Sequence, residues 1–263
     1  MEKHDKERKK LADILVDRLF VDNLTEAKAL IMTGKVIVNN QRIDKPGTLI
    51  KENSCIRIKA KSKYVSRGGD KLAGAIEDLK LNHQLSGRIA LDIGASTGGF
   101  SHCLLLHNIK HVIALDVGTN QLDWRIRNHP QVTSIEKTDI RKFNANLYPK
   151  IDLVVADISF NSLSRLASQI VGAVKNPKAE YLLLVKPQFE LDKNEIPKGG
   201  IVRDHSLQAK AIEQVKAAFL LLEYECKGLV KSRIEGKHGN QEYFIYLQSK
   251  PAETANKKSP TID

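Results

Sequence analysis

A glycine-rich turn directly after an apolar strand constrains this chain more than any other feature. Residues 89–93 form the apolar run, and the sequence continues Gly-Ala-Ser-Thr-Gly-Gly-Phe to residue 100. Glycine at such a point lets the backbone turn sharply and pass close to a ligand, because no Cβ is present to clash. Asp116 ends the next apolar run, at a distance where an acid can accept both hydroxyls of a ribose. The segment therefore predicts a sheet that binds an adenosine-type cofactor.

Apolar, strand-sized runs alternate with helix-like patterns through most of the chain. The runs lie at residues 89–93, 111–115, 132–135, 152–156 and 181–185. Alternation of this kind favours an α/β fold, a Rossmann-like parallel sheet with helices on both faces. Two later strands, at residues 224–232 and 242–248, flank a polar loop and predict a hairpin at the edge of the sheet.

The turn by itself is compatible with three interpretations. A nicotinamide site usually reads Gly-x-Gly-x-x-Gly, whereas here a single glycine is followed by Ala-Ser-Thr and a glycine pair. Asp92, two positions before the first glycine, would repel a pyrophosphate but suits the amino group and sulfonium of S-adenosylmethionine. An ordinary glycine-rich turn is the third interpretation. We favour S-adenosylmethionine. The residues expected to hold it are Asp92, Gly94, Ala95, Ser96, Thr97, Gly98, Gly99, Asp116 and Asp139.

Asp139 follows the third strand and could meet the adenine amino group, although a loop N-cap explains it equally well. The eight histidines and three cysteines show no spacing typical of metal ligands, so we expect no metal and no disulfide framework.

Polar residues follow other strands at the edge where ligands of open sheets bind. Asp157 and Lys186 each come directly after four apolar residues, and Glu242 begins the last strand. A buried ammonium needs an anionic partner, and Asp157 on the neighbouring strand is the obvious one. A purely structural Lys–Asp pair is the alternative interpretation.

The first 60 residues predict a separate, compact basic module. Helical spacing at residues 11–20 and a second helix that opens at residues 24–31 are followed by a strand–turn–strand pattern at residues 36–43, whereas residues 1–10 are expected to be frayed or an extra basic turn. The segment 22–47 resembles the S4 RNA-binding domain. That resemblance implies that cations contact structured RNA through its phosphates, which position the RNA without reading its sequence. The candidates are Lys28, Lys35, Arg42, Lys45 and, just after the module, Arg67.

The order of motifs over residues 10–248 resembles the TlyA family. Besides the S4-like module, the resemblance rests on segments 66–72, 92–100, 157–160, 185–190 and 239–244. It implies a ribosomal RNA 2′-O-methyltransferase with an FtsJ-like catalytic domain and cytidine targets in the large, and in some members the small, ribosomal subunit. The family's Lys-Asp-Lys-Glu tetrad falls here on Lys71, Asp157, Lys186 and Glu242.

The tetrad has a chemical rationale. Methyl transfer to a ribose hydroxyl is an in-line displacement, so much of the catalysis is positioning. Lys186 could stabilise the developing alkoxide as a cation or accept the proton as a base, and both roles stay open. Asp157 would orient Lys186, whereas Lys71 and Glu242 would position the substrate and that lysine.

Composition bounds the remaining choices. The chain has 263 residues and a net charge of +11, of which residues 1–63 hold +6 (15 Lys+Arg against 9 Asp+Glu). A positive excess favours nucleic acid or an anionic membrane surface. No apolar run reaches the ~18 residues of a membrane span, and no secretory signal begins the chain, so a cytoplasmic protein is expected.

We therefore predict an S4-like domain at residues 1–61, a linker at 62–66, an FtsJ-like methyltransferase domain at 67–248 and a disordered tail at 249–263. Two other functions compete with this one. A non-catalytic ribosome-assembly factor would be expected to have lost part of the tetrad or the glycine-rich turn, and both are intact. A haemolysin that acts on membranes would leave the cofactor motif unexplained.

Overall fold

The computed structural model describes residues 8–58, 63–236 and 238–251. The chain divides into two compact units, Met1–Lys61 and Ser62–Asp263, and each is described by itself. The expected disordered tail lies largely outside the described residues, although Ser249 ends the last strand. No helix among the described residues is long and apolar enough to cross a bilayer.

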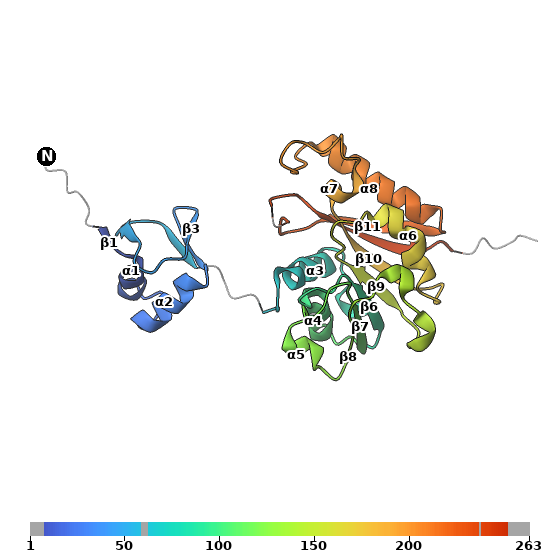
Figure 1. The fold of residues 1–263 in the computed structure, drawn as a ribbon, viewed down its shortest axis with the longest axis horizontal. Coiled ribbons are helices and arrows are strands. Elements are labelled where there is room, and N and C mark those ends of the chain that lie inside the picture. Colours follow the sequence, from blue (N-terminus) through green and yellow to red (C-terminus); the bar gives the residue numbers. More distant parts are fainter. Residues whose placement is uncertain (1–7, 59–62, 237, 252–263) are drawn as a thin grey trace, which may run out of the picture. The chain divides into compact units, whose positions relative to one another are not determined.

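The N-terminal unit packs two short helices against short strands (Figure 1). A three-stranded antiparallel sheet has the order β3-β2-β5, and β1 pairs with β4. A small apolar core forms between the helices and strands, with Leu11, Leu15 and Ile31 fully buried. The elements are β1 (Arg8–Lys10), α1 (Leu11–Asp17), α2 (Leu24–Met32), β2 (Val36–Val38), β3 (Gln41–Ile43), β4 (Leu49–Lys51) and β5 (Ile56–Ile58).

Local sequence explains the turns of this unit. Asn39 and Asn40 both have positive φ angles (48° and 67°) and connect β2 to β3, as expected for an Asn-Asn hairpin turn. Gly34 follows the end of α2 with a φ of 65°, the left-handed conformation that favours glycine there. One expectation was wrong: Arg8, Lys9 and Lys10 are neither frayed nor a turn but form β1. Their register on β4 supplies backbone hydrogen bonds that a charged sequence does not reveal.

The second unit is built on a seven-stranded sheet with the order β11-β12-β10-β9-β6-β7-β8. Strands β10, β9, β6, β7 and β8 run parallel to one another, whereas β12 is antiparallel to both β10 and β11. The expected hairpin at the edge of the sheet is therefore present. The strands are β6 (Ile89–Ile93), β7 (His111–Leu115), β8 (Val132–Ile135), β9 (Leu153–Ala156), β10 (Glu180–Val185), β11 (Tyr224–Lys231) and β12 (Tyr243–Ser249).

Helices cover both faces of this sheet (Figure 1). Alternate residues of the strands explain the two layers: Leu183 and Val185 pack with α6 and α8, whereas Leu182 and Leu184 pack with α3 and α4. The sheet thereby places the carboxyl ends of β6, β7, β8, β9 and β10 at one edge, together with the start of the antiparallel β12. The helices are α3 (Arg67–Asp78), α4 (Gly99–Leu106), α5 (Trp124–Arg127), α6 (Leu163–Gly172), α7 (Pro187–Glu190) and α8 (His205–Leu220), with short 3-10 turns at η1 (Asn82–Gln84), η2 (Ile140–Lys142) and η3 (Ala145–Leu147).

Candidate active site

The glycine-rich turn joins β6 to α4 and needs its glycines for conformation and for space. Gly94 and Gly98 have φ angles of 77° and 88°, which side chains rarely adopt. A Cβ on Gly94 would lie 2.8 Å from the carbonyl oxygen of Asp157, so the turn passes close to the end of β9. A Cβ on Gly99 would lie 2.8 Å from the backbone nitrogen of Gly69, at the start of α3. The turn therefore meets two candidate catalytic segments at once.

Two cavities open beside the turn. The larger, of about 340 Å³, is lined by Gly94, Ser96, Asp116, Asp139 and Asp157 among others. The smaller, of about 90 Å³, shares Gly94, Ser96 and Asp157 and adds Ala95, Thr97 and Gly99. Of the nine residues expected to hold a cofactor, only Asp92 and Gly98 line neither cavity, because both are buried behind the turn.

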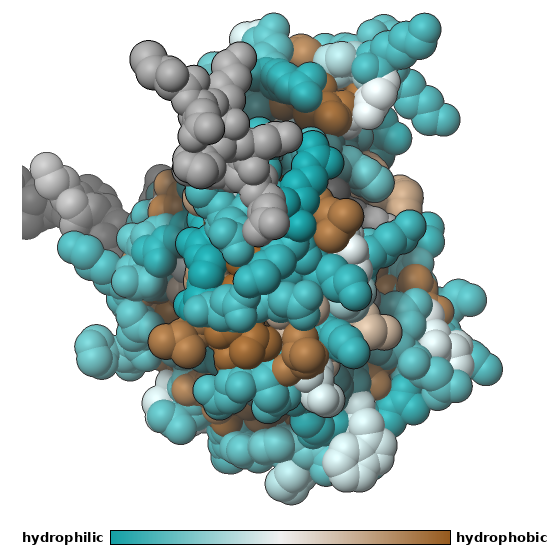
Figure 2. Space-filling view, turned by 90° about the vertical axis from the view of Figure 1, so that its left-hand side faces the viewer, coloured by the Kyte–Doolittle hydropathy of each residue, from teal (hydrophilic) through white to brown (hydrophobic). Residues whose placement is uncertain are grey.

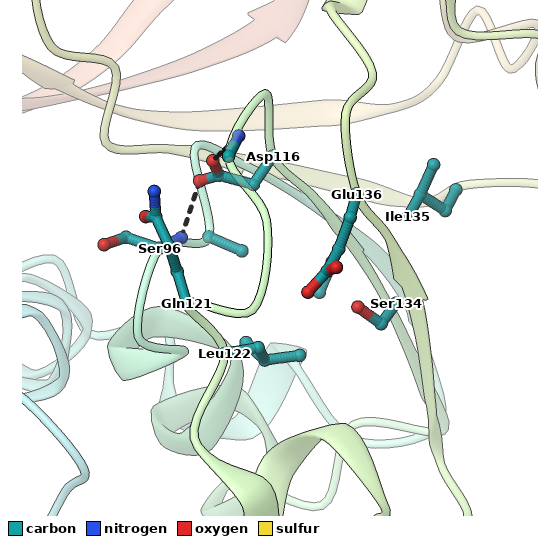
Figure 3. Close-up of a pocket in the computed structure, with 10 residues that line it drawn as sticks. Ser96, Asp116, Gln121, Leu122, Ser134, Ile135 and Glu136 are labelled. Atoms are coloured by element: carbon teal, nitrogen blue, oxygen red, sulfur yellow. Dashed lines mark hydrogen bonds between the residues drawn. The ribbon is translucent and has the colours of Figure 1, made fainter.

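Asp116 is fixed by the backbone that surrounds it (Figure 3). One carboxylate oxygen accepts a hydrogen bond from the Ser96 N–H at 2.7 Å, and the other accepts one from the Gly118 N–H at 2.6 Å. Gln121 and Glu136 line a third and much smaller cavity, of about 10 Å³, next to Asp116. The carboxylate thus ties the glycine-rich turn to the loop after β7 and still faces the larger cavity.

Asp92 is a fully buried acid. Ser101 donates a hydroxyl hydrogen bond of 2.7 Å to one oxygen, while Oδ1 has no hydrogen-bond partner among the described residues. Burial raises the pKa of Asp92 to about 7, which the Ser101 hydrogen bond opposes and the nearby charge of Asp157 reinforces. An unpaired, buried carboxylate oxygen next to the glycine-rich turn can accept a hydrogen bond from a cationic or N–H group.

Asp139 is the N-cap of a short helical turn and also lines the larger cavity. Its side chain caps η2 by accepting a hydrogen bond from the Arg141 N–H at 2.9 Å, so the N-cap interpretation describes it correctly. The Arg141 guanidinium also binds both of its oxygens and lowers the pKa of Asp139 to about 2. Asp139 lines the larger cavity as well, so an ionised acceptor faces that space.

Lys186 lies at the carboxyl end of β10 and is nearly buried. Its Nζ is 2.6 Å from Asp157 Oδ1 and donates a 2.7 Å hydrogen bond to Ser159 Oγ. The Lys186 side chain is 8% exposed and that of Asp157 is 26% exposed, since Asp157 faces both cavities. Burial of the ammonium is thus offset by one charge and one hydroxyl, and the pair borders the open space.

A second ion pair, between Lys71 of α3 and Glu242, is more deeply buried. Lys71 Nζ lies 2.5 Å from Glu242 Oε2, and the side chains are 8% and 3% exposed. Register connects this pair to the first, because Val185 of β10 is opposite Tyr243 of β12. Lys186 follows the one and Glu242 precedes the other, so the two segments adjoin at one edge of the sheet. The four tetrad residues thus come from α3, from the positions directly after β9 and β10, and from the position directly before β12.

Two aromatic residues border the Lys186 pair. Phe160 is 89% exposed and has a φ of 66°, an unfavourable backbone conformation for a large side chain. Its ring centroid is 5.6 Å from that of Phe189, and both rings line a cavity of about 630 Å³. A strained, exposed aromatic at a cavity mouth suggests a role in ligand binding. Trp124, by contrast, is 76% exposed and lies outside these cavities, as expected for a surface aromatic.

The cations expected to contact RNA fall in different units. Lys28, Arg42 and Lys45 are exposed on the N-terminal unit and Lys35 is half-buried, whereas Arg67 is exposed at the start of α3. The Arg42 guanidinium lies against Gly34, next to Lys35, because a Cβ on Gly34 would be only 2.2 Å from it. Hydrophilic side chains cover most of the face that Figure 2 shows, with smaller hydrophobic groups between them.

Sequence reasoning missed three polar residues that support the site. Ser159 contacts Lys186, Glu190 binds the start of α6, and Asn240 holds the loop around Val202. All three lie within the motif segments 157–160, 185–190 and 239–244, but hydrogen bonds to distant residues leave no periodic signal. No cluster that could hold a metal occurs among the residues the structure describes.

Comparison with known proteins defines the class first. A sequence model of the FtsJ-like methyltransferase family matches residues 64–249, and a model of the S4 domain matches residues 9–54. The second unit is therefore a methyltransferase domain that follows an S4 domain.

The relatives narrow that class. A Mycobacterium tuberculosis protein named 16S/23S rRNA (cytidine-2′-O)-methyltransferase TlyA is 37% identical over 238 residues, 89% of this chain and 88% of that protein. A Campylobacter jejuni 23S rRNA (cytidine-2′-O)-methyltransferase TlyA is 38% identical over 70% of each chain. A solved Streptococcus thermophilus structure, named a hemolysin, has 33% identity and a TM-score of 0.72, covering 94% of this chain and 90% of that one. The chain belongs to the TlyA family of FtsJ-like methyltransferases.

Proposed function

We propose that this protein transfers a methyl group from S-adenosylmethionine to the 2′-hydroxyl of cytidine in ribosomal RNA, in the cytoplasm. The relatives named as rRNA (cytidine-2′-O)-methyltransferases support this substrate class. The observation that carries the proposal is Lys186, a nearly buried ammonium held by Asp157 and Ser159 at the border of the cavity beside the glycine-rich turn. Such a group can meet an oxygen that develops negative charge.

The residues present fit S-adenosylmethionine. Its amino group and sulfonium are cationic, and the unpaired Oδ1 of Asp92 leaves a buried acceptor behind the turn. Gly94 lines both cavities beside the turn, and the absence of its Cβ lets the turn pass close to the end of β9. Asp116 would accept the ribose hydroxyls and Asp139 the adenine amino group, with Ala95, Ser96, Thr97 and Gly99 around the methionine end. The bound cofactor supplies an electrophilic methyl group.

The chain's own residues would act on the nucleophile. The 2′-hydroxyl is a weak acid, so attack requires either stabilisation of the developing alkoxide or removal of the proton. Lys186 is the group for either task, and Asp157 holds its ammonium in place at 2.6 Å. Lys71 and Glu242 form the adjoining pair that positions the substrate and the Lys186 segment. Phe160 and Phe189 would line the cleft that receives the target nucleotide.

The S4 domain would supply the initial RNA contact. Lys28, Lys35, Arg42 and Lys45 place several cations on one small unit, and Arg67 adds another in the methyltransferase domain. Contacts of this kind go to phosphates, so they hold the RNA without selecting the base. Selection of cytidine is then a task of the cleft.

The test is tritiated methyl transfer to purified 30S and 50S subunits, with wild type beside Lys186→Ala. Lys178→Ala, an exposed lysine just before β10 at the opposite edge of the sheet, is the matched control. Label in alkali-resistant dinucleotides with wild type and control only would support 2′-O transfer that depends on Lys186. Equal label with all three proteins would overturn the catalytic assignment. No label with wild type, despite cofactor binding, would favour a non-catalytic RNA-binding assembly factor.

A further inference from the structure

Glu190 is a buried acid that the proposed mechanism does not use. It ends α7, the short helix that begins directly after Lys186, and it is 5% exposed. Its carboxylate points at the start of α6, which begins shortly after Asp157 and Ser159. Glu190 therefore connects two loops that each carry one half of the Lys186–Asp157 pair.

Four hydrogen bonds hold this carboxylate. Oε1 accepts the Leu163 N–H at 2.7 Å, whereas Oε2 accepts the hydroxyls of Ser162 at 2.7 Å and Ser164 at 2.9 Å, and the Ser164 N–H at 3.2 Å. Ser162 is itself the N-cap of α6 and accepts the Arg165 N–H. Within the described ranges, no lysine or arginine pairs with Glu190, so the N-terminus of α6 and two hydroxyls compensate its charge.

The contacts of Glu190 lie only a few residues from both members of the Lys186–Asp157 pair. Asp157 lies five residues before Ser162, and Lys186 lies four residues before Glu190. Each loop is held at its strand by the sheet and at its far end by the Glu190 carboxylate. The loop 157–162 also carries Ser159 and Phe160, so Glu190 anchors the far end of the segment that supplies the Lys186 contacts on that side.

We infer that Glu190 is a positioning residue that holds Lys186 and Asp157 at their working separation. This inference rests on the proposed function, because it assigns Glu190 a task in methyl transfer and not only in helix capping. Without the carboxylate, the two loops lose their common anchor and can separate. A misplacement of about 1 Å can cost about 100-fold in rate, so the effect should exceed that of a lost cap.

The experiment compares Glu190→Ala, Glu190→Gln and Ser164→Ala with wild type. We expect Glu190→Ala to lower kcat at least about 30-fold, with the KM for S-adenosylmethionine within about threefold of wild type. Glu190→Gln keeps the size and one acceptor for the Leu163 N–H, so it should recover part of the rate. Ser164→Ala removes a single hydroxyl contact and should cost about two- to threefold.

Asp204→Ala is the control, because Asp204 caps α8 through Ser206 and has no contact with the site. It should lower the Tm while kcat stays unchanged. A Glu190→Ala protein that behaves like this control, with a lower Tm and a kcat within twofold of wild type, would reduce Glu190 to a helix cap and overturn the inference.

Crystal structures of the soluble Glu190 variants give a readout that does not depend on activity. A Lys186 Nζ to Asp157 Oδ1 separation well beyond the 2.6 Å of the native pair supports the inference, and an unchanged separation in both variants overturns it. An inactive wild type would instead defeat the proposed function, while these distances would still decide whether Glu190 positions the pair. If Glu190→Ala does not fold, the kcat of Ser164→Ala, which loses one of the four contacts, tests the inference instead.

Discussion

The two buried lysines of the site are held in different ways. Lys71 and Glu242 are 8% and 3% exposed, so that pair is closed on both sides. Lys186 is equally buried, but its partner Asp157 is 26% exposed and faces two cavities, and Ser159 adds a hydroxyl. A closed pair can contribute only to structure and position, whereas a pair with an open side can also meet a ligand. The two lysines are equally buried, yet one belongs to a scaffold pair and the other to a pair that can meet a ligand.

The largest expected effect comes from replacing the lysine of the open pair. Lys186→Ala should lower the methyl-transfer kcat by about 10²–10⁴-fold, because it removes the group that meets the attacking oxygen. Lys186→Arg keeps the charge but cannot accept a proton at neutral pH. Single-turnover rates of the two variants therefore separate the roles: an arginine variant clearly faster than the alanine variant indicates charge stabilisation, and equal rates indicate a base.

Breaking the closed pair should chiefly cost stability. Glu242→Ala leaves the Lys71 ammonium buried without its partner, which we expect to lower the free energy of unfolding by about 3–5 kcal/mol. Asp157→Ala should cost about 1–2 kcal/mol, because Lys186 keeps Ser159 and gains access to water through the cavity. Urea unfolding measures both values.

The double variant Lys71→Met/Glu242→Leu is the control for that comparison. It removes both charges and should regain most of the lost stability without regaining activity. Equal losses for Glu242→Ala and Asp157→Ala would show that exposure of the partner does not distinguish the two pairs.

Sequence could anticipate these pairs only up to a point. Runs such as residues 182–185 predict a buried strand, and a lysine after such a run needs an anion, which identified Asp157 as the partner. The antiparallel insertion of β12 beside β10 brings Glu242 next to the Lys186 segment, and no local pattern encodes that register. The family resemblance named Glu242 all the same, whereas Glu190 was not anticipated, since its partners are backbone N–H groups and hydroxyls of another loop. The periodicity of the sequence predicted the strands and helices, whereas the long-range hydrogen bonds were found only in the structure.

Asp92 extends the comparison to a buried acid that forms no ion pair with a lysine among the described residues. Its pKa is raised to about 7 from 3.8, so the folded state favours the neutral form. Its contribution to stability is present at acid pH and is lost as pH rises from about 4 through about 7, by up to ~4 kcal/mol. Asp92→Asn should remove that slope and make the free energy of unfolding higher than that of wild type above pH 7. Urea unfolding at pH 5 and pH 8 measures it.

Asp204→Asn is the matched control for the sign. Hydrogen bonds from Ser206 hold the pKa of Asp204 below its usual range, so its contribution is present at neutral pH and lost on acidification. A wild-type to Asp92→Asn difference that stays constant with pH would contradict the assignment of the buried charge to Asp92.

Replacement of Phe160 tests whether a nucleotide binds beside the Lys186–Asp157 pair. Phe160→Ala should raise the KM for the ribosomal subunit or lower kcat by about tenfold, in line with the ~1–3 kcal/mol of one base–aromatic stack. Its Tm should not fall, because the ring is 89% exposed and its φ of 66° is strained. Trp124→Ala, which removes another exposed aromatic outside the cavities, should leave both kinetic constants unchanged.

The smallest expected effect per residue lies with the exposed cations of the S4 domain. Lys28→Ala or Arg42→Ala replaces a solvated charge, so neither should change the free energy of unfolding by more than ~0.5 kcal/mol. Each should reduce the slope of log K against log salt for rRNA binding by about one, because one phosphate contact is lost. Lys51→Ala, an exposed lysine of β4 in the same unit, is the control and should leave the slope as it is. If the salt slope is also unchanged in Lys28→Ala and Arg42→Ala, these two residues do not contact the RNA phosphates. If either variant lowers kcat at saturating RNA, the replaced cation contributes to catalysis, a role that we expect only of the buried lysines.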